Sequence, residues 1–81
     1  MYYVYILKDD NSSIYIGYTN NIERRFSEHQ SGKCFTTRKL NNPQVYYIEG
    51  YTNEEDARTR ERKLKQFGSS YVGLMKRIGL K

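Results

Sequence analysis

The chain has 81 residues, a length that fits one domain with a small hydrophobic core. It carries 14 Lys/Arg against nine Asp/Glu, and 37% of its residues are hydrophobic, which excludes an intrinsically disordered chain. One cysteine and one histidine exclude a disulfide framework and a structural zinc site. No stretch is apolar enough to span a membrane and no signal-peptide pattern is present, so we expect a single cytoplasmic domain over residues 1–81.

The N-terminal part of the sequence predicts a β-hairpin. Residues 2–8 are an apolar and aromatic run rich in strand formers, and residues 9–12 have the composition of a turn. A second strand is expected over residues 13–18. We predict a pairing register in which Tyr5 and Tyr15 project from the same face of the sheet.

A helix is predicted after the hairpin. The sequence Asn-Asn-Ile-Glu at residues 20–23 has the form of an Asn N-cap with Glu at position N3. The helix should run to about Ser31, with Gly32 at its C′ position. A polar loop over residues 32–43 should follow, and it contains the only proline of the chain.

A third strand and two further helices are predicted in the remainder. Strand formers occupy residues 44–51, and residues 52–56 have the composition of a helix start. This second helix should end near Phe67, and Ser69 should cap a third helix. The apolar residues of the third helix recur at helical spacing: Tyr71, Leu74, Met75 and Ile78. The order β-β-α-β-α-α predicts a small α+β domain, with a three-stranded antiparallel sheet flanked by helices.

Positive charge is concentrated in the last third of the chain. Residues 1–56 carry six Lys/Arg and eight Asp/Glu, whereas residues 57–81 carry eight Lys/Arg and one acid. A basic block of this kind suits an anionic partner, and nucleic acid is the commonest one. A solvated helix face explains the same charges equally well at this point.

Two polar residues are predicted on the inward side of the first helix. Ile22 and Phe26 mark its apolar stripe, and Arg25 and His29 fall on the same stripe, whereas Glu28 points elsewhere. An arginine on the buried side needs an anionic partner, because an unpaired buried charge costs several kcal/mol. That partner is either a structural carboxylate or a ligand, unless the side chain extends to solvent.

Glu61 is the only acid in the basic block and is predicted to lie on the inward side of the second helix. Ala57, Leu64 and Phe67 mark that stripe, and Glu61 falls within it. The residue is either a buried counter-ion, for instance for Arg25, or a hard oxygen ligand for a divalent metal. An inward Arg and an inward Glu that face a tyrosine-bearing sheet together provide the groups needed for phosphodiester chemistry.

The order of these motifs resembles the GIY-YIG nuclease superfamily, from Tyr2 to about Ile78. The superfamily module also forms the N-terminal part of the excinuclease component that carries it, and the later segment resembles the short bacterial members. The motifs that carry the resemblance are Tyr3-Val4-Tyr5, Tyr15-Ile16-Gly17, Thr19-Asn20-x-x-x-Arg24-Arg25-x-x-x-His29, and Ala57-Arg58-x-x-Glu61-x-x-Leu64-Lys65 followed by Gly68 and Tyr71.

The resemblance implies catalytic roles for two tyrosines and a glycine. Tyr5 ends the first triplet and would match the tyrosine proposed as the general base. Tyr15 opens the second triplet and would match the partner that orients the base or the water. Gly17 would contribute to substrate binding by letting the backbone turn sharply beside the phosphate.

Three further residues complete the implied site. Arg25 would match the arginine that binds the scissile phosphate, and His29 would match the histidine found one turn later. Glu61 would match the sole carboxylate ligand of one Mg²⁺ or Mn²⁺ ion. The basic residues expected to contact DNA lie in the loop and in the basic block: Lys33, Arg38, Lys63 and Lys65.

The sequence departs from the superfamily pattern in ways that keep other functions open. The first triplet is Tyr-Val-Tyr, and no asparagine follows Asn53, although some members carry one beyond the catalytic Glu. The preferred interpretation is a metal-dependent endonuclease of structured or single-stranded DNA, with DNA repair as its context. One alternative is an inactive module of the same fold that binds DNA or RNA. The other is an interaction protein in which Arg25 and Glu61 form a buried ion pair.

Overall fold

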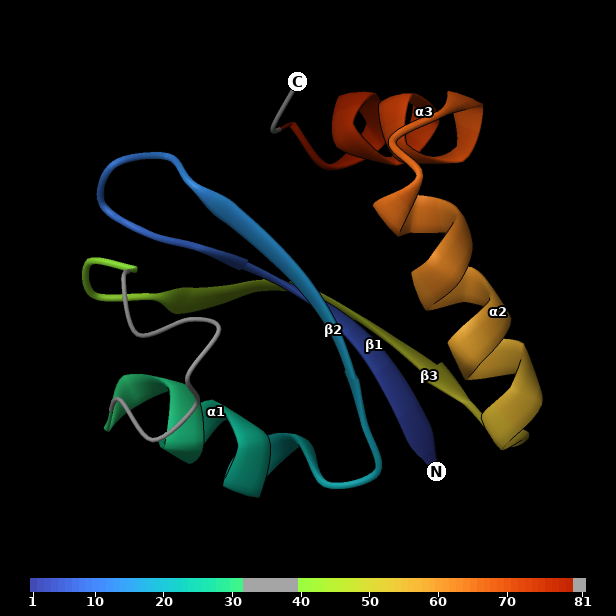
Figure 1. Ribbon diagram of the computed structural model, residues 1–81, viewed down its shortest axis with the longest axis horizontal. Helices are drawn as coiled ribbons and strands as arrows, with labels where there is room; N and C mark the ends of the chain where they lie inside the picture. Colours follow the sequence, from blue (N-terminus) through green and yellow to red (C-terminus); the bar gives the residue numbers. More distant parts are fainter. Residues whose placement is uncertain (32–39, 80–81) are drawn as a thin grey trace.

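A computed structural model describes residues 1–31 and 40–79, and their elements follow the predicted order β-β-α-β-α-α (Figure 1). The predicted α+β fold, with three antiparallel strands, is confirmed. Within these two ranges no helix has both the length and the hydrophobicity needed to cross a membrane. The elements are β1 (Tyr2–Lys8), β2 (Ile14–Thr19), α1 (Ile22–Gln30), β3 (Gln44–Tyr51), α2 (Glu54–Lys65) and α3 (Ser69–Ile78).

The sheet has the strand order β2-β1-β3, with β1 in the centre. In the β1–β2 hairpin Tyr5 pairs with Gly17 and Leu7 pairs with Tyr15. Side chains alternate between the two faces of a strand, so Tyr5 and Tyr15 project from the same face. The predicted register of the hairpin is therefore confirmed.

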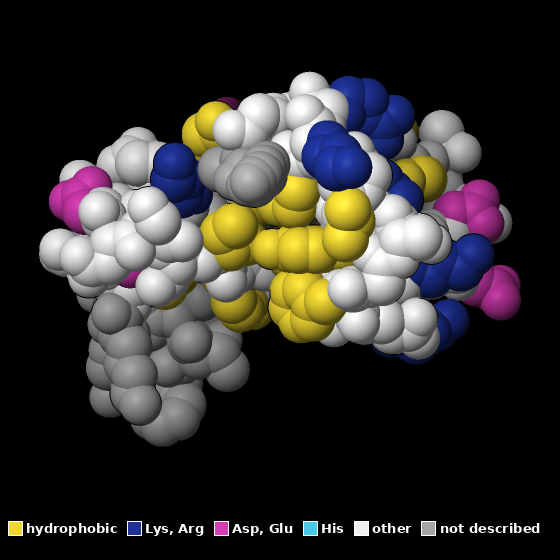
Figure 2. Space-filling view, turned by 90° about the horizontal axis from the view of Figure 1, so that it is seen from above, with side chains coloured by type: hydrophobic (Ala, Val, Ile, Leu, Met, Phe, Trp, Pro, Cys, Tyr) yellow, Lys and Arg dark blue, Asp and Glu magenta, His cyan; other side chains and the backbone are white. Residues whose placement is uncertain are grey.

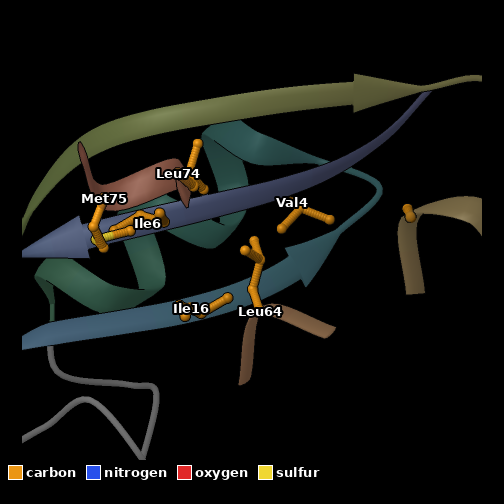
Figure 3. Packing of buried hydrophobic residues seen from close by; sticks show 7 residues of the cluster. Val4, Ile6, Ile16, Leu64, Leu74 and Met75 are labelled. Atoms are coloured by element: carbon orange, nitrogen blue, oxygen red, sulfur yellow. The ribbon is translucent and has the colours of Figure 1, made fainter. Parts of the chain in front are cut away.

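The two faces of the sheet bury different side chains. On one face the strand residues Val4, Ile6 and Ile16 point toward α2 and α3, where they meet Leu64 and Leu74 (Figure 3). On the other face β1 presents aromatic and apolar side chains toward α1, which lies on the opposite side of the sheet from α2 and α3 (Figure 1). The alternation along β1 thus separates a hydrophobic core from a second, more polar layer.

This small core leaves apolar side chains at the surface. Phe67 is 59% exposed and Val72 is 47% exposed. Figure 2 shows hydrophobic side chains gathered on the side of the molecule seen from above, with Lys and Arg side chains beside them. A domain of this size has too little polar surface to cover every apolar group, so such exposure is expected.

The first helix begins one residue later than predicted. Its N-cap is Asn21, whose side chain accepts a hydrogen bond from the backbone N–H of Arg24 at 3.0 Å. Glu23 therefore stands at position N2, and the predicted pairing of an Asn cap with Glu at N3 is wrong. The helix ends at Gln30 with Ser31 as its C-cap, while the predicted C′ residue, Gly32, lies outside the described residues.

The junction between α2 and α3 also differs from the prediction. Gly68, and not Ser69, is the N-cap of α3, and it makes no side-chain capping bond. Phe67 was predicted to face the core, but it adopts a left-handed backbone conformation with φ of 57°. Its ring packs against Tyr71 at a centroid distance of 4.7 Å and remains exposed. The turn that ends α2 therefore removes Phe67 from the apolar stripe of the helix.

Glu49 of β3 is the centre of a half-buried polar cluster on the α2 side of the sheet. Its carboxylate accepts hydrogen bonds from Nε and Nη2 of Arg60, both at 2.9 Å, and from the hydroxyls of Tyr47 and Tyr51 at 3.0 and 2.7 Å. Burial alone raises the pKa of Glu49, but the hydrogen bonds from Arg60, Tyr51 and Tyr47 outweigh it and hold that pKa below its ordinary value. Burial and the bond to Glu49 raise the pKa of Tyr51 to about 12.

We expect Glu49→Gln to lower the free energy of unfolding by about 1–3 kcal/mol at pH 7, because Arg60 then lacks its carboxylate in a half-buried position. The folded-state pKa of Glu49 lies below the unfolded value, so this stabilisation is fully present above the unfolded pKa of about 4.3. It is lost as the pH falls through the folded-state pKa. Urea unfolding of wild type and variant between pH 3 and pH 7 should show a difference that shrinks toward low pH. Asp10→Asn, at an exposed turn position, is the control, and a pH-independent difference for Glu49→Gln would contradict the prediction.

Candidate active site

Two tyrosines and a histidine form a cluster between the sheet and α1. The hydroxyl of Tyr5 and Nε2 of His29 are hydrogen-bonded at 2.8 Å, and both side chains are buried. Tyr15 packs against both, with ring-centroid distances of 6.2 Å to Tyr5 and 5.2 Å to His29. The hairpin register and the inward position of His29 on α1 bring these three predicted residues together.

Gly17 makes room for the Tyr5 ring. A Cβ atom built on Gly17 would collide with Cζ and the hydroxyl oxygen of Tyr5, and it would lie 2.8 Å from Cε2 of Tyr15. Gly17 stands in a regular strand position, and among the described glycines a positive φ occurs at Gly79. The expectation that Gly17 permits a sharp turn is therefore wrong. Its lack of a side chain lets the phenol of Tyr5 lie over the backbone of β2.

His29 is held in its neutral form. Burial lowers the pKa of His29 below its ordinary value of 6.5, and the positive charge of Arg25 lowers it further, against a smaller opposing effect of Glu28. A neutral imidazole carries one N–H donor and one acceptor nitrogen. When the proton is on Nδ1, Nε2 can accept the proton of the Tyr5 hydroxyl.

Arg25 is paired with a carboxylate of its own helix. Nη1 of Arg25 lies 3.0 Å from Oε1 of Glu28, and Nε of Arg24 lies 3.8 Å from the other carboxylate oxygen. Glu28 was predicted to point away from Arg25, but its side chain is only 33% exposed and reaches back along the helix at the i,i+3 spacing. The Arg25 guanidinium is thereby oriented beside the buried cluster.

Glu61 lies at the edge of the buried stripe of α2. Ala57 and Leu64 are fully buried, whereas the Glu61 side chain is 22% exposed. Its carboxylate lies 3.0 Å from Nζ of Lys65, and that ammonium lies 5.8 Å from the ring centroid of Tyr15. Glu61 therefore approaches the aromatic cluster by way of Lys65. Since Arg25 contacts Glu28 and Glu61 contacts Lys65, an Arg25–Glu61 ion pair is not needed to satisfy either residue.

Two open pockets lie beside β2 and share one residue, Arg58. The pocket that contains Glu61 is called the Glu61 pocket, and the one that contains Arg25 is called the Arg58 pocket. Since α1 and α2 lie on opposite sides of the sheet, the two pockets follow β2 at the sheet edge. The Glu61 pocket is lined by Arg58, Glu61, Arg62, Lys65 and Gln66. The Arg58 pocket is lined by Tyr18, Thr19, Asn20, Arg24, Arg25, Glu54 and Arg58.

The donor groups at the Glu61 pocket fit a divalent ion only together with a substrate. Within residues 1–31 and 40–79 no three His, Cys, Asp or Glu side chains gather into a metal-binding group. One carboxylate is a hard oxygen ligand of the kind that Mg²⁺ and Mn²⁺ prefer. Mg²⁺ keeps several waters and is commonly bound by one or two carboxylates plus phosphate oxygens of the substrate. Glu61 meets that requirement as the protein ligand.

The remaining predicted contact residues are dispersed. Lys63 and Lys65 are both exposed on α2, and only Lys65 lines the Glu61 pocket. Lys33 and Arg38 lie outside the described residues. The sequence reasoning missed Arg58 as a pocket residue. Its position three residues before Glu61 could have identified it, because side chains three apart lie on the same side of a helix.

Comparison with known proteins identifies the family. Residues 1–75 match the model of the GIY-YIG catalytic domain. The chain is 38% identical over 66 residues to a UPF0213 protein of Oceanobacillus iheyensis, which covers 80% of this chain and 77% of the relative. It is 40% identical over 68 residues to a UPF0213 protein of Clostridium perfringens, covering 82% and 72%. The solution NMR structure of the UPF0213 protein BH0048 from Bacillus halodurans superimposes with a TM-score of 0.59 at 29% identity, covering 96% of this chain and 85% of that one. The chain therefore belongs to the GIY-YIG family of nuclease catalytic domains.

Proposed function

We propose that the chain is a divalent-metal-dependent endonuclease that hydrolyses phosphodiester bonds in single-stranded or structured DNA. The observation that carries the proposal is the buried hydrogen bond between the Tyr5 hydroxyl and a neutral His29. A buried tyrosine next to a proton acceptor is suited to act as a general base. Arg25 and Glu61 flank this pair on α1 and α2, and the family match supplies the class of reaction.

The proposed reaction begins with proton transfer through Tyr5. His29 accepts the hydroxyl proton of Tyr5 at Nε2, and the phenolate oxygen then takes a proton from the attacking water. Tyr15 packs against both rings and fixes their orientation, so little reorganisation is needed at the moment of transfer. The pH dependence follows from His29, which must be neutral to accept the proton.

Positive groups around the aromatic cluster neutralise the phosphate. Arg25 presents a planar guanidinium that can bind two phosphate oxygens, and Glu28 holds it in place. Lys65 adds an ammonium group near the Tyr15 ring. These cations favour the additional negative charge that develops as water attacks phosphorus. When bound at Glu61, Mg²⁺ or Mn²⁺ supplies Lewis-acid stabilisation of the same charge.

A catalytically inactive module that binds nucleic acid is the second function to be tested. Lys65 already occupies the carboxylate of Glu61, and the described residues contribute only this one carboxylate to the Glu61 pocket. Both features suit a surface that binds phosphate without a metal. The third interpretation, a structural ion pair between Arg25 and Glu61, has less support, because each of these residues contacts a different partner.

Tyr5→Phe tests the proposed base. The variant keeps the ring over Gly17 and removes the hydroxyl, so we expect cleavage of single-stranded DNA to fall by about 10²–10⁴-fold. Loss of the bond to His29 should cost about 1 kcal/mol of stability. Rates are compared with those of Tyr3→Phe, a half-buried tyrosine on the same strand. Near-normal turnover in Tyr5→Phe would exclude Tyr5 as the base and leave Tyr15 as the next tyrosine to test.

Glu61→Ala separates cleavage from binding. We expect cleavage to disappear in both Mg²⁺ and Mn²⁺, because the variant lacks the carboxylate ligand. DNA affinity should persist or increase, since one negative charge leaves a pocket that faces phosphate. Fluorescence anisotropy with a labelled oligonucleotide and a cleavage assay on the same strand measure the two properties.

Glu55→Ala, which removes an exposed acid of the same helix, is the matched control and should cleave normally. Metal-dependent cleavage by Glu61→Ala would refute the metal role. An inactive wild-type protein that binds DNA with the expected salt dependence would favour the binding module. Loss of folding in Glu61→Ala would favour the structural ion pair.

A further inference from the structure

The side of α2 that faces the two pockets carries a row of charged residues. Arg58, Glu61, Arg62 and Lys65 follow one another at the spacings i, i+3, i+4 and i+7, and all of them line the Glu61 pocket. Residues at these spacings lie on one side of a helix. Arg58 stands at the N-terminal end of this row, about 4.5 Å along the helix axis from Glu61.

The structure holds the Arg58 side chain in a defined position. Its Nε lies 3.3 Å from a carboxylate oxygen of Glu54, and its guanidinium carbon lies 5.1 Å from the ring centroid of Tyr18. The Tyr18 hydroxyl donates a hydrogen bond of 2.7 Å to the same Glu54 oxygen. A guanidinium has five N–H donors, and the contact with Glu54 uses the one on Nε. The side chain is 60% exposed, so a ligand in solution can reach it.

The Arg58 pocket is positively charged. Arg24 and Arg25 line it from α1, Arg58 lines it from α2, and Glu54 is its one acidic lining residue. Glu54 is already engaged by Arg58 and by the Tyr18 hydroxyl. Three guanidinium groups that converge from two helices suit an oxyanion that accepts several hydrogen bonds, and phosphate is the group that arginine binds in this bidentate manner.

We propose that Arg58 is a second phosphate-binding residue, which holds in the Arg58 pocket the phosphate adjacent to the scissile one. The inference rests on the proposed function, because the scissile phosphate is placed between Arg25 and Glu61. Arg58 lines the pockets of both residues, so a strand that contacts both must pass beside it. Arg58 thereby positions the strand along β2 and sets the register in which one phosphodiester enters the site.

Binding of a single-stranded oligothymidylate to metal-free protein tests the proposal without cleavage. We expect Arg58→Gln to lower affinity by roughly tenfold at low salt, with the slope of log K against log salt reduced by about 0.7, the value for one phosphate of a single strand. Arg58→Lys keeps the charge but lacks the planar fork, so it should restore the slope and only part of the affinity. Lys76→Gln removes one exposed positive charge of α3 and should leave the slope unchanged.

Glu54→Gln distinguishes phosphate binding from a purely structural role of Arg58. This variant removes the same ion pair and keeps the guanidinium. If Arg58 acts only by anchoring the start of α2, Glu54→Gln and Arg58→Gln should weaken binding equally. If Arg58 binds phosphate, Glu54→Gln should bind as tightly as wild type or more tightly. Melting temperatures of both variants show whether the fold is retained.

The outcomes separate this inference from the proposed nuclease function. Active wild-type enzyme with an Arg58→Gln variant of unchanged affinity, salt slope and KM would overturn the role of Arg58 and leave the nuclease function intact. Wild-type protein that fails to cleave, but binds DNA with the Arg58-dependent salt slope, would support the phosphate site and refute the enzyme. Protein that fails to bind DNA at all would overturn both.

Discussion

The phenol ring of Tyr5 lies over the backbone of Gly17, and this close approach fixes how the two sides of the domain are built. The pairing of these two residues sets the hairpin register, and a slip by one residue would move every side chain to the opposite face. Val4 and Ile6 would then leave the core, and Tyr5 would lose His29. Hydrophobic burial on the α2 side and the buried hydrogen bond on the α1 side therefore favour the same register.

The division of charge on α2 follows from the same arrangement. Successive arginines of this helix serve different strands, because residues two positions apart point to different sides. Arg60 turns toward β3 and is bound by the Glu49 carboxylate, whereas Arg58 turns toward β2 and stays exposed. Arg60 and Glu49 pair side by side within the fold, so this cation is used for stability. The row that includes Arg58 remains available for an anionic ligand.

Much of this organisation could be predicted from the sequence, because it follows from periodicity. The strand alternation predicts that Tyr5 and Tyr15 share a face, and helical spacing predicts that Leu74 and Met75 are buried. Helical spacing also predicts the inward position of His29, whose buried contact is with Tyr5. These features depend on one strand or one helix meeting a single apolar layer.

The features that sequence reasoning missed depend on contacts between residues remote from one another or on turn geometry. Phe67 fits the apolar stripe of α2, but the left-handed turn that ends the helix directs its ring outward. The strand order could not be read from the chain, and neither could the contact of the Asp9 carboxylate with the backbone N–H of Asn41 at 3.0 Å. Gly17 was identified correctly as a special position for the wrong reason, since the ring that requires it comes from the neighbouring strand.

The location of the site on an edge strand gives this small domain access to a strand of nucleic acid from both sides of its sheet. β2 has one free edge in the sheet order, so α1 and α2 can approach its residues from opposite faces. The tyrosines and His29 are buried on one side, where exclusion of water strengthens the hydrogen bond between Tyr5 and His29. Glu61 and Arg58 lie toward the other side, half-buried or exposed, where a substrate can reach them. A buried base layer and an accessible charged layer can meet across one strand only if that strand carries no side chain where the base approaches. That condition is met at Gly17.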